Sequence, residues 1–529
     1  MEKNIVKEMD PYDLKTLLDN LKKTLYLSNI QNYFPIHETL DNFSSQTIFK
    51  SKYHLVELLE NLNENYENEK QKSPYLKRIF KSKVTLQNTK SILERNVFIK
   101  ISPLLHVLQF ITNNFECNAT LLPNDKYHYT QNYINNPNNE AYIDSFYSFL
   151  ASKLTETGKA PCFPLFYGTF SAIAKEYKSD ISEEYSLVKY NQDFQKNRDR
   201  VFSITEIDID MSDDNDEEQL SDDNFEEVNT NLENILKLET LDDNNLIENV
   251  NKSNYDSNNS DNQIIDNYES SDNEDFNDPT IKSIDAKHSF EEILDNNNTF
   301  KYCSLKNFPV QLLISEQLEI TLQDLIEERE ISEEEWCSIL FQICFGLSVA
   351  QKNHDFVHND LHVGNIMFKN TNIEYLYFKV NKKYFKIPTF GRITKIIDFG
   401  RATFKFNNNI YFSSVFDEDG DAEGQYDYPE ENNLNNCKFK PNPSFDLCRL
   451  ATTIVEHVTH ESIFKLLNEW MTDKNGKNLI YEEDDFDLYI NIARNIKNAI
   501  PKKQLNKTIF KRFNVLKKDI SSLTFIYSL

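Results

Sequence analysis

Apolar residues along this chain follow the spacing of strands first and the spacing of helices later. The run from Val97 to Ile101 is short, apolar and partly β-branched, which predicts a buried strand. Residues 139–157 place apolar side chains at helical intervals, and Gly158 follows where glycine commonly ends a helix. Two further runs are predicted to be strands, at 163–173 and 310–314.

Helical spacing dominates the second half of the chain. Ser332 and Glu335 form a capping box ahead of an apolar stripe that reaches Ala350, which predicts a long buried helix. Ser444 is expected to cap a further helix that runs through Val458, and more helical sequence follows it. Strand-rich sequence followed by helix-rich sequence indicates an α+β fold.

Two more regions are interpreted from their spacing. Residues 1–70 carry leucines at helical intervals, including Leu14 and Leu21, and we interpret them as an accessory N-terminal helical region ahead of a larger domain over 71–529. Tyrosines and lysines alternate on both sides of residues 381–383, which predicts an added β-hairpin.

The net charge of -28 is concentrated in one segment. Residues 206–278 hold 25 acidic side chains and two lysines, which is -23 of the -28. The surrounding range 204–298 contains no glycine and is too highly charged to form a packed core. We therefore expect a disordered acidic insert within the strand-rich part. It would serve as a solvated spacer, as a tract phosphorylated on its serines, or as a docking site for a basic partner.

Composition also limits the partners and the compartment. Outside the acidic segment the chain is nearly neutral, so it lacks the basic excess of nucleic-acid-binding proteins, and no nucleic acid is expected. Seven cysteines are scattered without a C-x-x-C pair, which is typical of the reducing cytoplasm. No run of about 18 apolar residues occurs, so no membrane partner is expected.

The strongest chemical signal is a pair of motifs in the second half. The motif HNDLHVGN occupies 358–365 after the long predicted helix, and DFG occupies 398–400 after an apolar run. Phosphoryl transfer to a hydroxyl requires a carboxylate that accepts the proton and oxygen ligands that hold Mg²⁺. Asp360 fits the first role, and Asn365 and Asp398 fit the second. The motifs therefore predict a phosphotransferase that uses ATP and Mg²⁺.

This order of motifs, H-x-D-L-x-x-x-N and then D-F-G, resembles the catalytic and metal-binding signature of the protein kinase superfamily. The resemblance covers roughly 90–175 and 300–465. It implies a bilobal fold with a small β-rich N-lobe and a mostly helical C-lobe. It also implies ATP-dependent phosphorylation of Ser or Thr hydroxyls on protein substrates, although the sequence does not decide between these and tyrosine.

The catalytic loop is an unusual variant of the kinase pattern. Asn359 and His362 stand where arginine and lysine are usual, which is similar to haspin-type kinases and to small-molecule kinases. With Asn359 there, a phosphorylated residue is not expected to order the activation segment. His362 is expected either to contact the γ-phosphate or to pack within the loop. The variant and the asparagine-rich composition resemble serine/threonine kinases of giant DNA viruses of the mimivirus type, which implies the host cytosol or the virion as location.

The resemblance also assigns residues outside the two motifs. Lys100 resembles the strand lysine that neutralises the nucleotide phosphates, and Asp144 is its expected partner, with Glu140 next. Backbone groups near Glu316 to Leu318 are expected to hydrogen-bond adenine. Finally, the resemblance assigns a structural role to Asp446, which is expected to brace the catalytic loop.

Two features depart from the kinase pattern. No glycine precedes Gly158, so the glycine-rich loop that should cover the phosphates ahead of Lys100 is absent. No A-P-E motif follows DFG, and residues 428–430 (Tyr-Pro-Glu) are the candidate remnant. These departures leave two alternatives open. One is a pseudokinase that acts as a binding or scaffold module, and the other is a kinase of small molecules.

Overall fold

The computed structural model describes most of the chain in segments. They are residues 5–40, 47–62, 78–86, 91–112, 122–123, 129–208, 299–417, 420–426, 441–479, 485–522 and 524–529.

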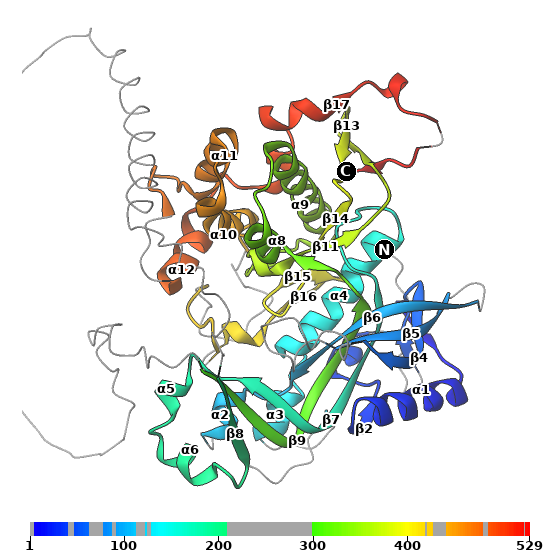
Figure 1. Ribbon diagram of the computed structural model, residues 1–529, viewed down its shortest axis with the longest axis vertical. Helices are drawn as coiled ribbons and strands as arrows, with labels where there is room; N and C mark the ends of the chain where they lie inside the picture. The colour runs from blue at the N-terminus through cyan, green and yellow to red at the C-terminus, as the bar shows by residue number, and fades with distance from the viewer. Residues whose placement is uncertain are drawn as a thin grey trace, which may run out of the picture. The chain divides into compact units, whose positions relative to one another are not determined.

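Strands and helices are mixed in an α+β architecture whose largest sheet has seven strands (Figure 1). The strands follow the order β2-β7-β9-β6-β5-β4, with β8 beside β9. The strand predicted at 97–101 is the middle of β6, and Lys100 there pairs with Leu313 of β9. Most of the other two predicted runs fall in β7 and β9. The bounds are β2 Leu27–Gln31, β4 Tyr53–Asn61, β5 Ile79–Leu86, β6 Ile92–Pro103, β7 Phe166–Asp180, β8 Phe202–Asp208 and β9 Thr299–Glu316.

The first part of the chain is less helical than predicted. Among its described residues, the only α-helix is α1 (Pro11–Thr24), which Asp10 caps by accepting a hydrogen bond from Tyr12 N at 2.9 Å. Strands β1 (Val6–Glu8) and β3 (Thr47–Phe49) pair with each other, and β4 pairs with β5 in the main sheet. The expectation of a helical region is therefore wrong outside α1, because pairing with distant strands decides the conformation there.

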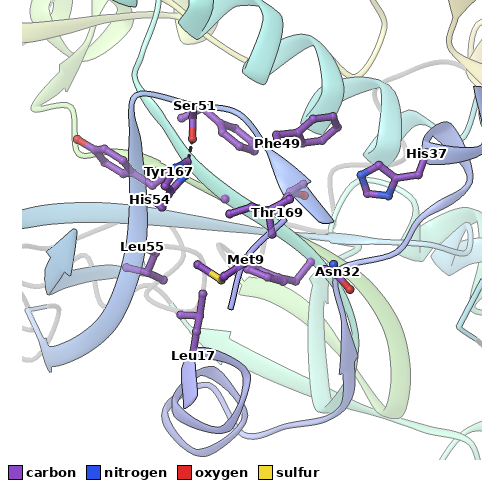
Figure 2. Close-up of a pocket in the computed structure, with 14 residues that line it drawn as sticks. Met9, Leu17, Asn32, His37, Phe49, Ser51, His54, Leu55, Tyr167 and Thr169 are labelled. Atoms are coloured by element: carbon purple, nitrogen blue, oxygen red, sulfur yellow. Dashed lines mark hydrogen bonds between the residues drawn. The ribbon is translucent and has the colours of Figure 1, made fainter. Parts of the chain in front are cut away.

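A small cavity lies where this N-terminal part meets the main sheet (Figure 2). Leu17 of α1, His54 of β4 and Thr169 of β7 are among the side chains around it. Ser51 Oγ lies 2.8 Å from His54 Nδ1 at its edge. The cavity volume of about 20 Å³ has room for about one water molecule, so this is not a nucleotide site.

Helix α4 (Glu140–Glu156) is the helix predicted at 139–157, and it packs against the sheet. Asn139 caps it by accepting a hydrogen bond from Ala141 N at 3.1 Å. Gly158 follows the helix with φ of +69°, a conformation that favours glycine. The ring of Phe149 on α4 meets that of Phe166 on β7 edge to face, with centroids 5.6 Å apart. These contacts fix α4, which carries Asp144, against the sheet that carries Lys100.

Helices dominate the second half as predicted, and α9 (Glu333–His354) is the long buried one. Ser332 caps it by accepting a hydrogen bond from Glu335 N at 3.3 Å. The expectation for Ser444 is wrong, because its side chain forms no cap and its buried hydroxyl finds no partner among the described residues. Asn442 Oδ1 instead accepts a hydrogen bond from Ser444 N at 3.0 Å, and the helix ends at Ile454.

The remaining helices are short to medium in length. They are α2 Val107–Ile111, α3 Tyr129–Ile134, α5 Tyr185–Val188, α6 Gln192–Asn197, α8 Leu322–Glu328, α10 Phe445–Ile454, α11 Glu461–Met471, α12 Asp485–Asn495 and α13 Pro501–Gln504.

Small sheets surround the two motifs. The predicted hairpin is confirmed as β12 (Tyr375–Val380) and β13 (Lys383–Pro388), in which Tyr377 lies opposite Lys386. It is widened by β17 and β18 from the end of the chain. A three-stranded sheet joins β11 and β14, which lie between the motifs, to β10, which precedes them, in the order β10-β11-β14. The bounds are β10 Ile320–Thr321, β11 Ile366–Asn370, β14 Arg392–Ile396, β15 Thr403–Phe406, β16 Asn409–Phe412, β17 Asn514–Val515 and β18 Tyr527–Ser528.

Two predicted segments, the acidic insert and the A-P-E remnant, lie wholly or largely outside the described residues. Residues 204–208 of the predicted acidic insert belong to β8, and 209–298 lie outside the described residues. Residues 428–430, the candidate A-P-E remnant, also lie outside them. Within the described part of the chain, no helix has both the length and the apolar character needed to cross a membrane. Residues 1–205 and 301–529 belong to one compact unit.

Candidate active site

Lys100 joins two carboxylates from different parts of the chain. Its Nζ lies 2.8 Å from Asp144 Oδ2 on α4 and 2.8 Å from Asp398 Oδ1 in the DFG motif. Asp144 also accepts a hydrogen bond from Phe399 N at 2.9 Å. Glu140, the second candidate partner, forms no ion pair with Lys100 among the described contacts, and Glu156 at the end of α4 pairs with Lys153. Strand β6, helix α4 and the DFG motif therefore meet at Lys100.

The charges in this trio support one another. Burial works against the charged ammonium, but Asp144 and Asp398 together hold the pKa of Lys100 well above its usual range. Burial likewise opposes ionisation of Asp398, yet the charge and hydrogen bond of Lys100 lower the pKa of Asp398 to about 2. Lys100 is therefore a cation and Asp398 an anion at neutral pH. Asp144 is 3% exposed, so its charge depends on Lys100 for compensation.

A buried carboxylate binds the backbone of the catalytic loop. Asp446, on α10, accepts hydrogen bonds from His358 N at 3.0 Å and from Asn359 N at 3.1 Å. The side chain of His358 reaches the other motif, since its Nε2 lies 2.9 Å from Ile397 O. These bonds fix the loop backbone and tie it to the residue directly before Asp398.

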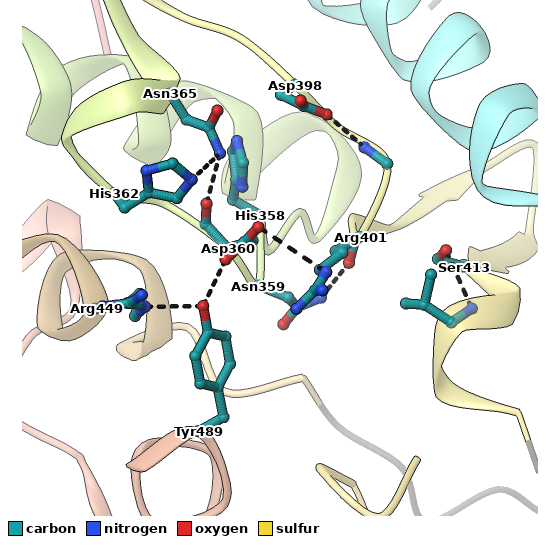
Figure 3. Close-up of polar contacts among 12 residues, drawn as sticks. His358, Asn359, Asp360, His362, Asn365, Asp398, Arg401, Ser413, Arg449 and Tyr489 are labelled. Carbon is teal, nitrogen blue, oxygen red and sulfur yellow. Dashed lines mark hydrogen bonds and ion pairs between the residues drawn. The ribbon is translucent and has the colours of Figure 1, made fainter. Parts of the chain in front are cut away.

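Asp360 projects from this loop toward two side chains (Figure 3). The hydroxyl of Tyr489 on α12 donates a hydrogen bond to Asp360 Oδ1 at 2.6 Å. Arg401 Nε lies 3.9 Å from Asp360 Oδ2, which is a weak ion pair. The Asp360 side chain is 23% exposed, so it remains within reach of a substrate group.

Asn365 lies on the other side of Asp360 and is oriented by its neighbours. Its Nδ2 donates to the backbone carbonyl oxygen of Asp360 at 2.8 Å and lies 3.0 Å from His362 Nε2. His362 Nδ1 accepts a hydrogen bond from Gly364 N at 3.1 Å, and burial lowers the pKa of His362. His362 therefore packs within the loop as a neutral ring beside Asn365. Because Nδ2 is engaged, Asn365 Oδ1 is the atom that could bind a metal ion.

The oxygens of Asp398 and Asn365 suit Mg²⁺. This ion prefers oxygen ligands and commonly takes only one or two from the protein, with phosphate oxygens and water supplying the rest. Within the described ranges, no three His, Cys, Asp or Glu side chains gather into a metal-binding group. A site that shares the ion with a nucleotide fits this arrangement better than an all-protein cage does.

Glu316 and Leu318, the two residues expected to contact adenine, differ in whether their backbone groups already form hydrogen bonds. Glu316 has both its side chain and its N–H engaged, since Oε1 pairs with Lys395 Nζ at 3.0 Å and N donates to Leu165 O at 2.9 Å. Its N–H is therefore not available to adenine, and adenine binding by backbone groups near Glu316 to Leu318 stays a prediction. The backbone of Leu318 forms no hydrogen bond with the described residues and stays available.

The side chain of Asn359 links the segment after DFG to the catalytic loop by hydrogen bonds. Its Nδ2 donates to Arg401 O at 2.9 Å and to Thr403 Oγ1 at 3.3 Å, and its Oδ1 accepts a hydrogen bond from the Tyr426 hydroxyl. Asn359 is fully buried and has φ of +65°, which asparagine tolerates better than most residues. The neutral amide of Asn359 thus binds the segment after DFG through hydrogen bonds that involve no phosphorylated residue.

Sequence reasoning missed Tyr489, Arg401 and Lys395, which touch residues of the site. Tyr489 reaches Asp360 across 129 residues of sequence, and no motif surrounds it. Arg401 directly follows DFG, so its position was the one available signal. Lys395 lies in an apolar run, where its pairing with Glu316 is not visible from sequence.

The architecture and the motif geometry together are compatible with the protein kinase superfamily. Similarity to known proteins points to haspin-type serine/threonine kinases within it. The chain is 36% identical to mouse haspin over 94 residues, which is 18% of this chain and 12% of that protein. It is 25% identical to the Drosophila melanogaster haspin homologue over 173 residues, 31% of each chain. The Arabidopsis thaliana homologue is 39% identical over 75 residues, 14% of this chain and 12% of that protein.

These similarities are partial. The chain covers well under two thirds of each of these relatives, and no family model matches it. They support descent from serine/threonine kinases for part of the chain, and they leave the activity, substrate and partners of the whole protein to be proposed.

Proposed function

We propose that this protein is an ATP-dependent protein kinase that phosphorylates Ser or Thr hydroxyls on protein substrates. One observation carries the proposal. Lys100 on β6 joins Asp144 and Asp398 at 2.8 Å each, and the DFG segment is tied to the loop that carries Asp360 and Asn365. Five residues suited to phosphoryl transfer thus come together from four distant segments. The bilobal arrangement and the acidic insert are part of the same proposal.

The chemistry follows from the positions of these side chains. Lys100 exchanges its contact with Asp398 for the nucleotide phosphates, and Asp398 and Asn365 then supply oxygen ligands to the metal. Mg²⁺, when bound, neutralises charge on the β- and γ-phosphates. Asp360 accepts the proton of the substrate hydroxyl. The hydroxyl oxygen bonds to the γ-phosphorus while the bond from that phosphorus to the β–γ bridging oxygen breaks, and ADP leaves.

The test is transfer of labelled γ-phosphate from Mg·ATP to the protein itself and to basic proteins. We expect transfer by the wild type and a loss of about a hundredfold or more in Asp360→Asn and Asp398→Asn. Nucleotide binding, measured as a rise in thermal midpoint with Mg·ATP, should persist in Asp360→Asn. Asp519→Asn, at an exposed aspartate far along the chain, is the matched control. Equal transfer by all four proteins would place the chemistry elsewhere.

A pseudokinase is the second candidate, and the absence of glycine before Gly158 favours it. Residues 63–77, which connect β4 and β5 ahead of Lys100 in the chain, lie outside the described residues. Nucleotide binding without transfer by the wild type would establish this alternative. Transfer to metabolites but not to proteins would instead indicate a small-molecule kinase. The location in a host cytosol or virion remains a prediction from the viral resemblance.

A further inference from the structure

We infer that Tyr489 is a positioning residue for the base Asp360, an inference that rests on the proposed kinase activity. The Tyr489 hydroxyl donates to Asp360 Oδ1 at 2.6 Å, while Oδ2 receives no hydrogen bond from the described residues. In Figure 3, Tyr489 approaches Asp360 from the side opposite Asn365. One carboxylate oxygen is thus fixed by a short hydrogen bond. The other has only the weak ion pair with Arg401 at 3.9 Å and remains able to accept a hydrogen bond from the substrate hydroxyl.

Tyr489 is itself held in place by α10. Arg449 Nε donates to the Tyr489 hydroxyl at 2.9 Å, and the guanidinium carbon of Arg449 lies 4.9 Å from the centre of the Tyr489 ring. The ring of Phe445 lies 5.9 Å from that of Tyr489. The hydroxyl therefore accepts one hydrogen bond and donates another, and both directions are determined by neighbouring groups.

Helix α10 therefore acts on the catalytic loop in two ways, through the loop backbone and through the side chain that binds Asp360. Asp446 binds the loop backbone at His358 and Asn359, and Arg449 orients the side chain that binds Asp360. Asp446 and Arg449 are three residues apart, so they lie on one face of the helix. A shift of α10 would move the loop backbone and the reactive carboxylate together.

The phenol is suited to this role across the working range of pH. Burial, followed by the nearby charge of Asp360, raises the pKa of Tyr489 to about 12. The hydroxyl therefore stays protonated and remains a donor. It places no formal charge beside Asp360, unlike a lysine at the same position. Its effect is to hold one rotamer of the carboxylate, so that its removal should slow the chemical step without weakening nucleotide binding.

The experiment compares the steady-state kinetics of Tyr489→Phe with those of the wild type. Phenylalanine fills the same space, so only the hydroxyl is lost. We expect kcat to fall about tenfold, the scale of one hydrogen bond to a charged group, with the KM for ATP and the thermal midpoint unchanged. Arg449→Gln should shift kcat in the same direction. Tyr377→Phe, at a half-buried tyrosine on β12, is the matched control and should change neither constant.

Three results would overturn the inference, and they differ from one another. An unchanged kcat in Tyr489→Phe, with an active wild type, would reduce Tyr489 to a packing residue and leave the proposed function standing. A raised kcat would mean that the hydroxyl blocks Asp360 and acts as an inhibitor. A wild type that binds Mg·ATP but transfers nothing would remove the proposed function and the inference with it.

Discussion

The carboxylate of Asp446 lies 3.0 Å from the backbone nitrogen of His358, a residue 88 positions earlier in the chain. A second bond, to Asn359 N at 3.1 Å, makes the carboxylate a two-point support for the catalytic loop. Asp446 is fully buried, so the support is formed at the cost of desolvating a charge. That cost makes the contact testable through pH.

Asp446→Asn should change the pH dependence of stability. Burial, the largest influence, raises the pKa of Asp446 to about 6, above its value of about 3.9 in an unfolded chain. Between these values the folded state retains a proton that the unfolded state has released, so stability falls as pH rises through about 6. The wild type should lose about 1.4 kcal/mol from this group between about pH 5 and pH 8, and the variant should not.

Urea unfolding at the two pH values measures this difference. Asp519→Asn, at an exposed carboxylate, should follow the wild type. The same slope in Asp446→Asn and in the wild type would show that Asp446 is ionised throughout.

Lys100→Met should separate stability from activity. It leaves the buried carboxylate of Asp144 without its cation, which should lower the free energy of unfolding by about 3 kcal/mol and abolish transfer. Lys81→Met, which removes an exposed ion pair to Glu94, should leave the free energy of unfolding nearly unchanged. Chemical denaturation and the transfer assay provide both readouts.

A double variant sharpens the interpretation of Lys100. Lys100→Met combined with Asp144→Leu should regain most of the lost stability, because the more deeply buried of the two carboxylates that pair with Lys100 is removed with it, while activity stays absent. Recovery of activity in the double variant would contradict the role assigned to Lys100.

Asn359→Arg would restore the residue that is usual in kinases, and we expect it to impair this protein. The side chain must replace the bonds to Arg401 and Tyr426 in a fully buried site, which should cost about 2–4 kcal/mol and reduce transfer. Asn407→Arg is the matched control, since Asn407 also has a positive φ, of 47°, but is exposed. Thermal unfolding that ranks the two variants alike would indicate that backbone conformation, and not burial, sets the cost.

His106 and Asp421 form a contact that should weaken at high pH. The 2.7 Å hydrogen bond to Asp421 raises the pKa of His106, and Glu140 and Glu184 act in the same direction against burial. A raised folded-state pKa contributes stability that is complete below about 6.5 and is lost as pH rises through the folded-state value. His106→Gln should therefore speed amide exchange in residues 420–426, relative to wild type, at low pH only.

Hydrogen exchange followed by mass spectrometry measures this ratio at each pH. His457→Gln, at an exposed histidine, should leave exchange in 420–426 unchanged. A ratio for His106→Gln that does not vary with pH would mean that the contact owes nothing to the charge of the ring.

Sequence reasoning was most successful where a local pattern carries the information. The spacing at 139–157 marks α4, and the alternation around 381–383 marks the β12–β13 hairpin. It failed where distant contacts decide. In the N-terminal region β4 becomes a strand because β5 offers it a partner. Ser444 does not cap α10, since its backbone is helical (φ -89°, ψ -7°) where a capping residue is usually extended.

The candidate site divides in the same way. Residues inside the two motifs, and Lys100 with Asp144, were named from sequence, and the structure brings them together. Tyr489 was not named, because a half-buried tyrosine on an amphipathic helix has no distinguishing pattern until the fold brings it to Asp360. The pairing of Glu316 with Lys395 was not foreseen either, since it depends on a neighbour that only the fold provides.

The pairing of β8 with β9 has a practical consequence for handling the protein. Because β8 ends at Asp208 and β9 begins at Thr299, residues 209–298 connect two strands that pair with each other. A short turn could join those strands in their place. The excised segment carries -23 of the net charge of -28, so the shortened protein would carry -5. Its retention on an ion-exchange column and its solubility would change greatly, while every residue named in the candidate site would still be present.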